Sequence, residues 1–372
     1  MKYKVKFVDM PKHYRSLRKE ILNTVDRVLS LGDVILRDDM RKFEKDIAKF
    51  VGTKFAVGVN SGFDALHLSV RAAGIGPGDE VITVAHTFVA TVAAVVHCGG
   101  TPILIDVGQD FNLNVDLLEK AITRRTKAII PVHLNGRLCN MEKIMSIARR
   151  HKLLVIEDAA QALGAKLKGK RAGSFGLTGC FSLYPFKMLG AFGDAGIVTT
   201  NSQEMAKKIT WLRDHGQDRL TGDIRLYGFN CRLDNLHAAI LNVKFKHFPR
   251  WINRRREVAE RYRKGLRDLA VLQLPHFDDK KYFDVYQNYV IRAEKRDGLV
   301  AYLRKSGIEI LITWSKPMHH HQALGLKKYK LPETERICQE VLSLPMNAEI
   351  NNQQVDFVIK TIRNFYCRNR IV

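Results

Sequence analysis

Short runs rich in valine and isoleucine recur along the first two-thirds of the chain, and segments with a helical pattern separate them. We predict strands at the apolar runs VITVA (81–85), PILIDV (102–107), AIIPVHL (128–134), LLVIEDAA (153–160), CFSLYPF (180–186) and GIVTTN (196–201). We predict helices at residues 62–74, 87–99 and 141–151. Strands that alternate with helices in this way indicate an α/β fold, in which helices cover both faces of a mainly parallel sheet.

The pattern changes after about Asn242. A long basic helix is predicted at residues 244–269, and a looser α+β stretch follows it and ends in a predicted helix at residues 353–366. We therefore predict two domains: a large one at residues 1–242, which includes the N-terminal segment, and a smaller C-terminal α+β domain at residues 243–372.

The composition is that of a globular protein, with 46% hydrophobic and 27% charged residues. No apolar run approaches the roughly 20 residues that span a bilayer, and the basic N-terminus lacks the apolar core of a signal peptide. We therefore expect a cytoplasmic protein. The six cysteines form no CxxC pair, which favours reduced thiols over disulfides or a zinc site. Three adjacent histidines at 319–321 share no face of a helix or strand, so we expect no metal there.

The formal net charge of +23 would suit a nucleic-acid-binding protein or an enzyme that attracts anionic substrates. It would also suit a protein whose surface is simply basic. The charges are spread from Lys2 to Arg370, and the chain has neither an aromatic-basic array nor a known nucleic-acid module. Nucleic-acid binding is therefore not expected as the main function.

Polar residues at the ends of two predicted strands are candidates for chemistry, because ligands of open α/β sheets gather at the carboxyl ends of strands. Asp158 follows the apolar run LLVIE, although an acid there could instead cap a helix. Lys187 follows CFSLYPF, where desolvation would lower the pKa of its amine; the alternative is a side chain that extends to solvent. Ser61 and Gly62 precede a helix whose N-terminal N–H groups could bind a phosphate.

Several ordered motifs resemble those of the DegT/DnrJ/EryC1/StrS family of sugar aminotransferases, from about Ile35 to the C-terminus. They are FEKDIAKFVGTKFAVGVNSGFDALHL, GIGPGDEVITVAHTFVAT, AIIPVHLNG, VIEDAAQALGA, CFSLYPFKMLGAFGDAG and YGFNCRLDNLHAAIL. The resemblance implies the PLP-transferase fold type I of aspartate aminotransferase. It also implies pyridoxal 5'-phosphate (PLP) as the cofactor and a homodimer with shared active sites.

The resemblance implies two catalytic residues. Lys187 matches the lysine that holds PLP as a Schiff base and then moves protons, and Asp158 matches the acid that pairs with the pyridine nitrogen and keeps the ring an electron sink. Gln161 matches the side chain that contacts the phenolic oxygen of the ring. Phe88 matches the aromatic residue stacked on the ring.

The resemblance also implies the residues that bind the cofactor phosphate. Gly62, Phe63 and Ser182 match positions in the same chain, and Asn230 matches an asparagine that reaches the phosphate from the neighbouring subunit. The common SGT motif of the family is SGF here. Phe63 can therefore offer its backbone N–H to the phosphate but no hydroxyl group.

The implied reaction moves an amino group from glutamate, which leaves as 2-oxoglutarate, to a nucleotide-linked keto-sugar in amino-sugar biosynthesis. Arg219 and Arg232 are candidates for the substrate diphosphate, but both could equally be structural ion-pair partners. The sequences GDAG (193–196) and HGQDR (215–219) resemble those of relatives that act on 3-keto sugars more than those of relatives that act on 4-keto sugars. Two alternatives remain: a PLP-dependent dehydratase, in which histidine replaces the lysine, and a non-catalytic binding or regulatory homologue. The retention of Lys187 argues against the first, and that of Lys187 and Asp158 against the second.

Overall fold

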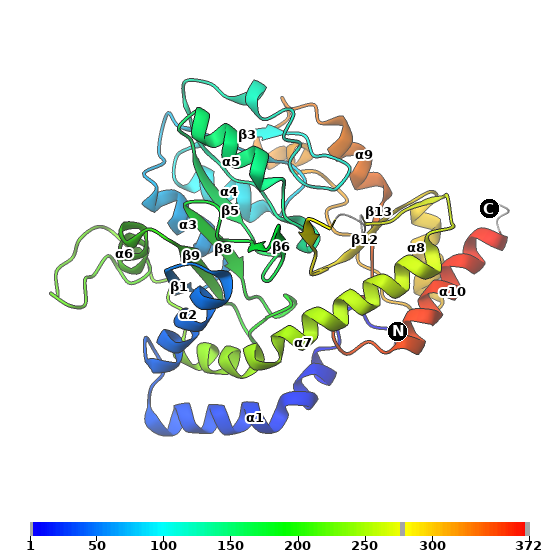
Figure 1. The fold of residues 1–372 in the computed structure, drawn as a ribbon, viewed down its shortest axis with the longest axis horizontal. Coiled ribbons are helices and arrows are strands. Elements are labelled where there is room, and N and C mark those ends of the chain that lie inside the picture. Colours follow the sequence, from blue (N-terminus) through cyan, green and yellow to red (C-terminus); the bar gives the residue numbers. More distant parts are fainter. Residues whose placement is uncertain (1–2, 276–279, 369–372) are drawn as a thin grey trace.

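A seven-stranded sheet forms the centre of the protein (Figure 1). The structure is a computed structural model, and it describes residues 3–275 and 280–368. The strand order of the sheet is β1-β9-β8-β5-β4-β2-β3, and its strands are β1 (Phe55–Val59), β2 (Glu80–Val84), β3 (Thr101–Ile105), β4 (Thr126–Ile129), β5 (Leu154–Asp158), β8 (Thr178–Ser182) and β9 (Gly196–Thr200). The pairs from β3 to β8 are parallel, whereas β9 runs antiparallel to both of its neighbours. The predicted mainly parallel sheet is therefore confirmed.

Both faces of this sheet are apolar. In β5, Val155 belongs to one hydrophobic cluster and Ile156 to another, and Phe181 and Cys180 of β8 divide in the same way. Because successive side chains of a strand point to opposite faces, this sheet needs a helical layer on each side. The helices that supply the layers are α1 (Met10–Leu31), α2 (Asp38–Val51), α3 (Gly62–Ala72), α4 (Val89–His97), α5 (Met141–Arg150), α6 (Gln203–Leu212) and α7 (Asn235–Leu266).

The predicted helices and strands are present, with bounds that differ by several residues in places. The strand predicted at 128–134 ends at Ile129, because the chain there leaves the ladder and pairs only through a single bridge from Val132 to Asp158. The long basic helix begins at Asn235 instead of near residue 244. Its first turns carry apolar residues that join the core under the sheet, namely Ala238, Ile240 and Leu241.

A smaller unit follows α7. It contains the three-stranded sheet β10-β12-β13, whose strands are β10 (Leu272–Gln273), β12 (Tyr289–Ala293) and β13 (Val341–Leu344), together with α8 (Arg296–Lys305), α9 (Pro332–Glu340) and α10 (Asn352–Arg368). A third small sheet joins β11 (Tyr282–Phe283) to β6 (Lys166–Leu167) and β7 (Lys170–Arg171). In the part of the chain that the structure describes there are also four short 3-10 helices: η1 (Glu119–Ala121), η2 (Leu134–Gly136), η3 (Met318–His320) and η4 (Gln322–Leu324).

The predicted boundary at residues 242 and 243 falls inside the continuous helix α7. The C-terminal half of this helix, from Val258 to Leu266, contributes to the hydrophobic core of the smaller unit. Val5 of the N-terminal segment joins the same core and pairs with Ile308. The division into two domains at this position stays a prediction. Among the described residues, no helix is long and apolar enough to cross a membrane.

Candidate active site

A cavity of about 750 Å3 opens at the carboxyl ends of β5 and β8. The large sheet, the starts of α3 and α4, and the smaller unit all contribute to its walls. Seven of the eight site residues predicted from the sequence line it: Gly62, Phe63, Phe88, Asp158, Gln161, Ser182 and Lys187. The eighth, Asn230, is not among the lining residues. Folding therefore gathers in one place residues that are spread over more than a hundred positions of the sequence.

Asp158 ends β5 and is buried. Its carboxyl group accepts hydrogen bonds from the Thr91 hydroxyl at 2.7 Å and from the Ala160 backbone N–H at 3.2 Å. Burial raises the pKa of Asp158, while these hydrogen bonds and the nearby Lys187 act in the opposite direction. Residues 159–165 form turns and contain no helix, so the alternative that Asp158 caps a helix is wrong.

Lys187 lies in the turn after β8, where its backbone N–H donates to the Tyr184 carbonyl at 2.8 Å. The residue is partly buried and lines the cavity. Burial lowers the pKa of the Lys187 amine, and the carboxyl group of Asp158 raises it. The amine therefore gives up its proton more readily than a surface lysine would, which is what a nucleophilic amine requires.

The start of α3 forms a site suited to an anion. The first N–H groups of a helix have no intrahelical acceptor, and the helix dipole is positive at this end. Ser61 caps the helix by accepting a hydrogen bond from the Asp64 N–H at 3.1 Å. A Cβ atom on Gly62 would lie 2.6 Å from the Cβ of Ser182, so only glycine lets α3 approach the end of β8 this closely. The Ser182 hydroxyl thus lies beside the helix N-terminus.

Two further predicted residues form cavity walls. Phe88, directly before α4, has a ring that is 62% exposed, which is unusual for phenylalanine unless a ligand or another chain covers it. The side-chain oxygen of Gln161 accepts a hydrogen bond from the Asn135 backbone N–H at 2.8 Å, which fixes the amide at the wall. The ring of Phe63 stacks on His67 at 5.5 Å, so this unusual residue packs along α3 and leaves its backbone N–H at the helix start.

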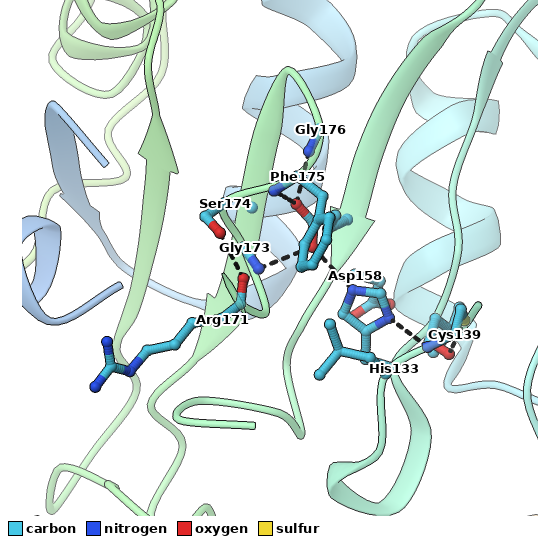
Figure 2. A network of polar contacts seen from close by, with 12 residues as sticks. His133, Cys139, Asp158, Arg171, Gly173, Ser174, Phe175 and Gly176 are labelled. Atoms are coloured by element: carbon cyan, nitrogen blue, oxygen red, sulfur yellow. Dashed lines mark hydrogen bonds and ion pairs between the residues drawn. The ribbon is translucent and has the colours of Figure 1, made fainter. Parts of the chain in front are cut away.

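Beside Asp158 lies a polar network that the sequence reasoning missed (Figure 2). Glu157 is fully buried and accepts hydrogen bonds from His133 Nε2 at 3.0 Å and from the backbone N–H groups of Gly173, Phe175 and Gly176 at 2.7 to 2.8 Å. His133 Nδ1 accepts the Cys139 N–H at 3.2 Å, so its proton is on Nε2. A buried carboxylate with this many donors fixes the end of β5. The signal in the sequence was a second acid inside an apolar strand.

These groups fit PLP by their chemistry. An acid for the ring nitrogen, an amine of lowered pKa, an exposed aromatic ring and an anion site at a helix start border the same cavity. The close approach enforced at Gly62 brings backbone and hydroxyl donors together, as a phosphate monoester requires.

The two candidate arginines do not line the cavity of this chain. Arg219 and Arg232 both bind Asp214, at 2.5 and 2.9 Å. Partial burial would raise the pKa of Asp214, but the two hydrogen bonds hold it below its usual value. Both arginines form ion pairs in this chain, and their role toward the substrate diphosphate stays a prediction.

Asn230 is exposed and pairs through a single antiparallel bridge with Asp214. It ends a segment that follows α6 and extends away from the body of the protein (Figure 1). This segment carries three exposed apolar side chains, of which Leu220 is 98% exposed; the others are Ile224 and Tyr227.

The three adjacent histidines behave differently from the expectation. His319 and His320 lie on η3, and their Nε2 atoms approach the same oxygen of Glu335 at 2.9 and 3.6 Å. Candidate ligand atoms of His319, His320 and Glu335 lie within 4.8 Å of one another. The argument that neighbouring histidines cannot point together is therefore wrong for this pair, and the absence of a metal there stays a prediction. All six cysteines are free thiols.

Comparison with known proteins agrees with this site. The model of the DegT/DnrJ/EryC1/StrS aminotransferase family matches residues 15–363. The chain is 42% identical to a pleiotropic regulatory protein of Geobacillus stearothermophilus, over 97% of this chain and 98% of that protein. It is 40% identical to the UDP-N-acetyl-3-dehydro-alpha-D-glucosamine 3-aminotransferase of Acidithiobacillus ferrooxidans, over 96% of this chain and 97% of that enzyme.

Among solved structures, S. venezuelae DesV in complex with a ketimine intermediate is similar over 98% of both chains, with a TM-score of 0.93 and 38% identity. Other similar structures hold pyridoxamine phosphate or PLP. The predicted PLP-transferase fold is confirmed. From the family match over nearly the whole chain and from the agreement in fold, we conclude that the protein belongs to the DegT/DnrJ/EryC1/StrS aminotransferase family and is a PLP-dependent sugar aminotransferase.

Proposed function

We propose that the protein transfers an amino group from glutamate to a nucleotide-linked 3-keto sugar. The observation that carries the proposal is the cavity at the ends of β5 and β8, where the low-pKa amine of Lys187 lies near the buried Asp158 and the anion site of α3. PLP bound there would supply an electron sink that stabilises negative charge on the carbon beside the transferred nitrogen.

Lys187 has two tasks in this proposal. Its amine would hold PLP, for which the neutral form is needed, and burial lowers the pKa of the amine in that direction. When it is not bound to the cofactor, the same amine would take up and release a proton in the cavity. A lysine that reached into solvent could do neither.

Asp158 would pair with the ring nitrogen of bound PLP and favour its protonated form. Its carboxyl group is directed by Thr91 and by the Ala160 N–H, and the buried Glu157 network fixes the end of the strand that carries it. Gly62, Phe63 and Ser182 would bind the phosphate through two backbone N–H groups and one hydroxyl. Phe88 would cover one face of the ring, and Gln161 would donate its amide N–H to the phenolic oxygen.

The choice of substrate rests on two supports. A cavity of about 750 Å3 has room for a cofactor and the sugar of a second ligand. The names of several relatives specify amination at carbon 3 of nucleotide-linked sugars, and the GDAG and HGQDR sequences resemble those of relatives that act on 3-keto sugars. Lys187 argues against the dehydratase alternative, and the intact site argues against a purely regulatory role, despite the regulatory name of one relative.

The experiment is an assay of matched 3-keto and 4-keto nucleotide sugars with glutamate, in which 2-oxoglutarate release and the position of the new nitrogen are measured by NMR. We expect amination at carbon 3. Amination of 4-keto sugars alone would contradict the regiochemistry, and no 2-oxoglutarate with any sugar would contradict the donor.

We further propose a homodimer in which Asn230 reaches the phosphate site of the partner. Its support is the projecting segment with exposed Leu220, Ile224 and Tyr227, and the position of Asn230 outside the cavity of its own chain. An inactive Lys187→Ala chain is mixed and reassembled with an equal amount of an inactive Asn230→Glu chain. About half the dimers should be hybrids, each with one intact site, so about a quarter of wild-type activity should return. No recovery, with hybrids detected by native mass spectrometry, would contradict the shared site.

A further inference from the structure

The segment that carries Lys187 contains neither helix nor strand. It runs from residue 183 to 195 between β8 and β9 and has few backbone hydrogen bonds of its own, among them Leu183 N–H to the Ala195 carbonyl and Ala191 N–H to the Leu183 carbonyl, both at 2.8 Å. The position of the Lys187 amine therefore depends on groups from elsewhere in the chain that hold this segment.

Gln287 is such a group, and it holds the backbone on both sides of Lys187. Its side-chain oxygen accepts the Met188 N–H at 2.9 Å, and its side-chain nitrogen donates to the Phe186 carbonyl at 3.0 Å. The residue is 7% exposed and lines the cavity. It lies two residues before the start of β12, about a hundred positions beyond Lys187 in the chain. An amide offers one acceptor and one donor side by side, which matches the N–H and C=O groups that flank the lysine.

Gln287 is itself rigidly held. Buried Arg255 of α7 donates to the carbonyl groups of Tyr286 at 2.9 Å and Gln287 at 3.1 Å. Tyr286 has a left-handed φ of 52°, a conformation that a bulky residue keeps only where its surroundings impose it. On the other side, a Cβ atom on Gly136 would lie 2.7 Å from the Tyr286 nitrogen, so the segment is packed against η2 as closely as glycine permits.

A second contact extends the same segment to the opposite wall. The Asn288 amide donates to the Asn135 side chain at 3.5 Å, and the Asn135 N–H in turn fixes Gln161. Gln287 thus contacts the segment that carries Lys187, and the next residue, Asn288, contacts Asn135, which holds Gln161.

We propose that Gln287 is the positioning residue of Lys187, which sets the direction of its amine in the cavity through the Phe186 and Met188 backbone. The inference rests on the proposed function in so far as Lys187 is the amine that binds PLP and moves protons. Because a displacement of about 1 Å at a reacting group costs on the order of a hundredfold in rate, two hydrogen bonds at this position matter more for turnover than for folding.

The test is Gln287→Met, which keeps the length of the side chain and removes both hydrogen bonds. Apoenzyme is mixed with PLP, reduced with borohydride at successive times, and the labelled Lys187 peptide is quantified by mass spectrometry. We expect labelling of Lys187 at least about tenfold slower than in wild type, and kcat lower by about a hundredfold with KM changed less than threefold.

Tyr262→Phe is the matched control, since it also removes a buried side-chain hydrogen bond to backbone in the smaller unit, that from Tyr262 to the Pro345 carbonyl at 3.0 Å. It should label at the wild-type rate. Wild-type labelling of Gln287→Met, or a rise in KM with unchanged kcat as expected for a substrate contact, would overturn the proposal. A failure of wild type to label at Lys187 would instead contradict the proposed function.

Gln287→Glu tests the same idea with an isosteric side chain in case the methionine variant does not fold. The carboxylate can still accept the Met188 N–H but cannot donate to the Phe186 carbonyl. Its labelling rate should lie between those of wild type and Gln287→Met, whereas a rate equal to wild type would overturn the proposal.

Discussion

Two lysines meet the same segment of chain and differ in what surrounds them. Lys187 belongs to the segment between β8 and β9 and lines the large cavity near Asp158. Lys244 comes from α7, is 1% exposed, donates to the Gly190 carbonyl and lies over the Phe192 ring at 4.6 Å. Burial lowers the pKa of both amines, that of Lys244 to about 8. A lowered pKa is therefore common to both amines, and the two lysines differ in the space around them: Lys187 lines the large cavity, whereas Lys244 packs against Gly190 and Phe192.

The largest expected difference between the two lysines is the loss of kcat when each is replaced in turn. Lys187→Ala should lower kcat by at least about a thousandfold, because the amine that binds PLP and moves protons is lost. Lys244→Met should lower it less than about tenfold, since Lys244 does not line the large cavity and its loss removes only the contacts with Gly190 and Phe192. Steady-state assays with fold checked by circular dichroism measure both. Comparable losses of kcat in the two variants would contradict a special role of Lys187.

Asp158→Asn removes the carboxyl group that raises the pKa of Lys187. Single-turnover rates should fall by about a hundredfold or more, because the ring nitrogen loses its ionic partner. The carboxyl group raises the pKa of Lys187, so its loss should lower that pKa further. The pH dependence of amine labelling of Lys187 in the apoenzyme measures this shift. An unchanged labelling profile would mean that the two groups do not interact.

The smallest effect concerns the pH dependence of stability. The pKa of Lys244 falls to about 8 in the folded protein from its ordinary value of 10.5, so between these two pH values the unfolded state binds more protons. The free energy of unfolding should then rise with pH, by about 1 kcal/mol from pH 8 to 9 for this group. Denaturant titrations of wild type and Lys244→Met should differ by this increment. Parallel curves would place the pKa of Lys244 near its ordinary value.

The sequence predicted the site residues at strand ends and in motifs better than those that packing between distant segments brings to the site. Asp158 and Lys187 could be found because parallel strands bring their carboxyl ends to one edge of a sheet, and motif resemblance added Gly62, Phe88 and Ser182. Thr91 and Gln287 could not be found, since their roles depend on packing between distant segments.

Other differences have equally local causes. The 3-10 turn of η3 directs His319 and His320 to one acid, which neither a helical nor an extended pattern predicts. The Glu157 network needed the positions of three backbone N–H groups from the segment before β8. Asn230 lies outside the cavity of its own chain, so a single chain leaves its role as a prediction.

The most direct test of the account is the location of the cofactor. Wild-type holoenzyme is reduced with borohydride, digested, and searched by tandem mass spectrometry for lysines that carry the pyridoxyl phosphate group. We predict one modified site, Lys187, and no modification of Lys244, although the pKa of Lys244 is also low. Modification at Lys244 or at another lysine, with Lys187 recovered intact, would contradict it.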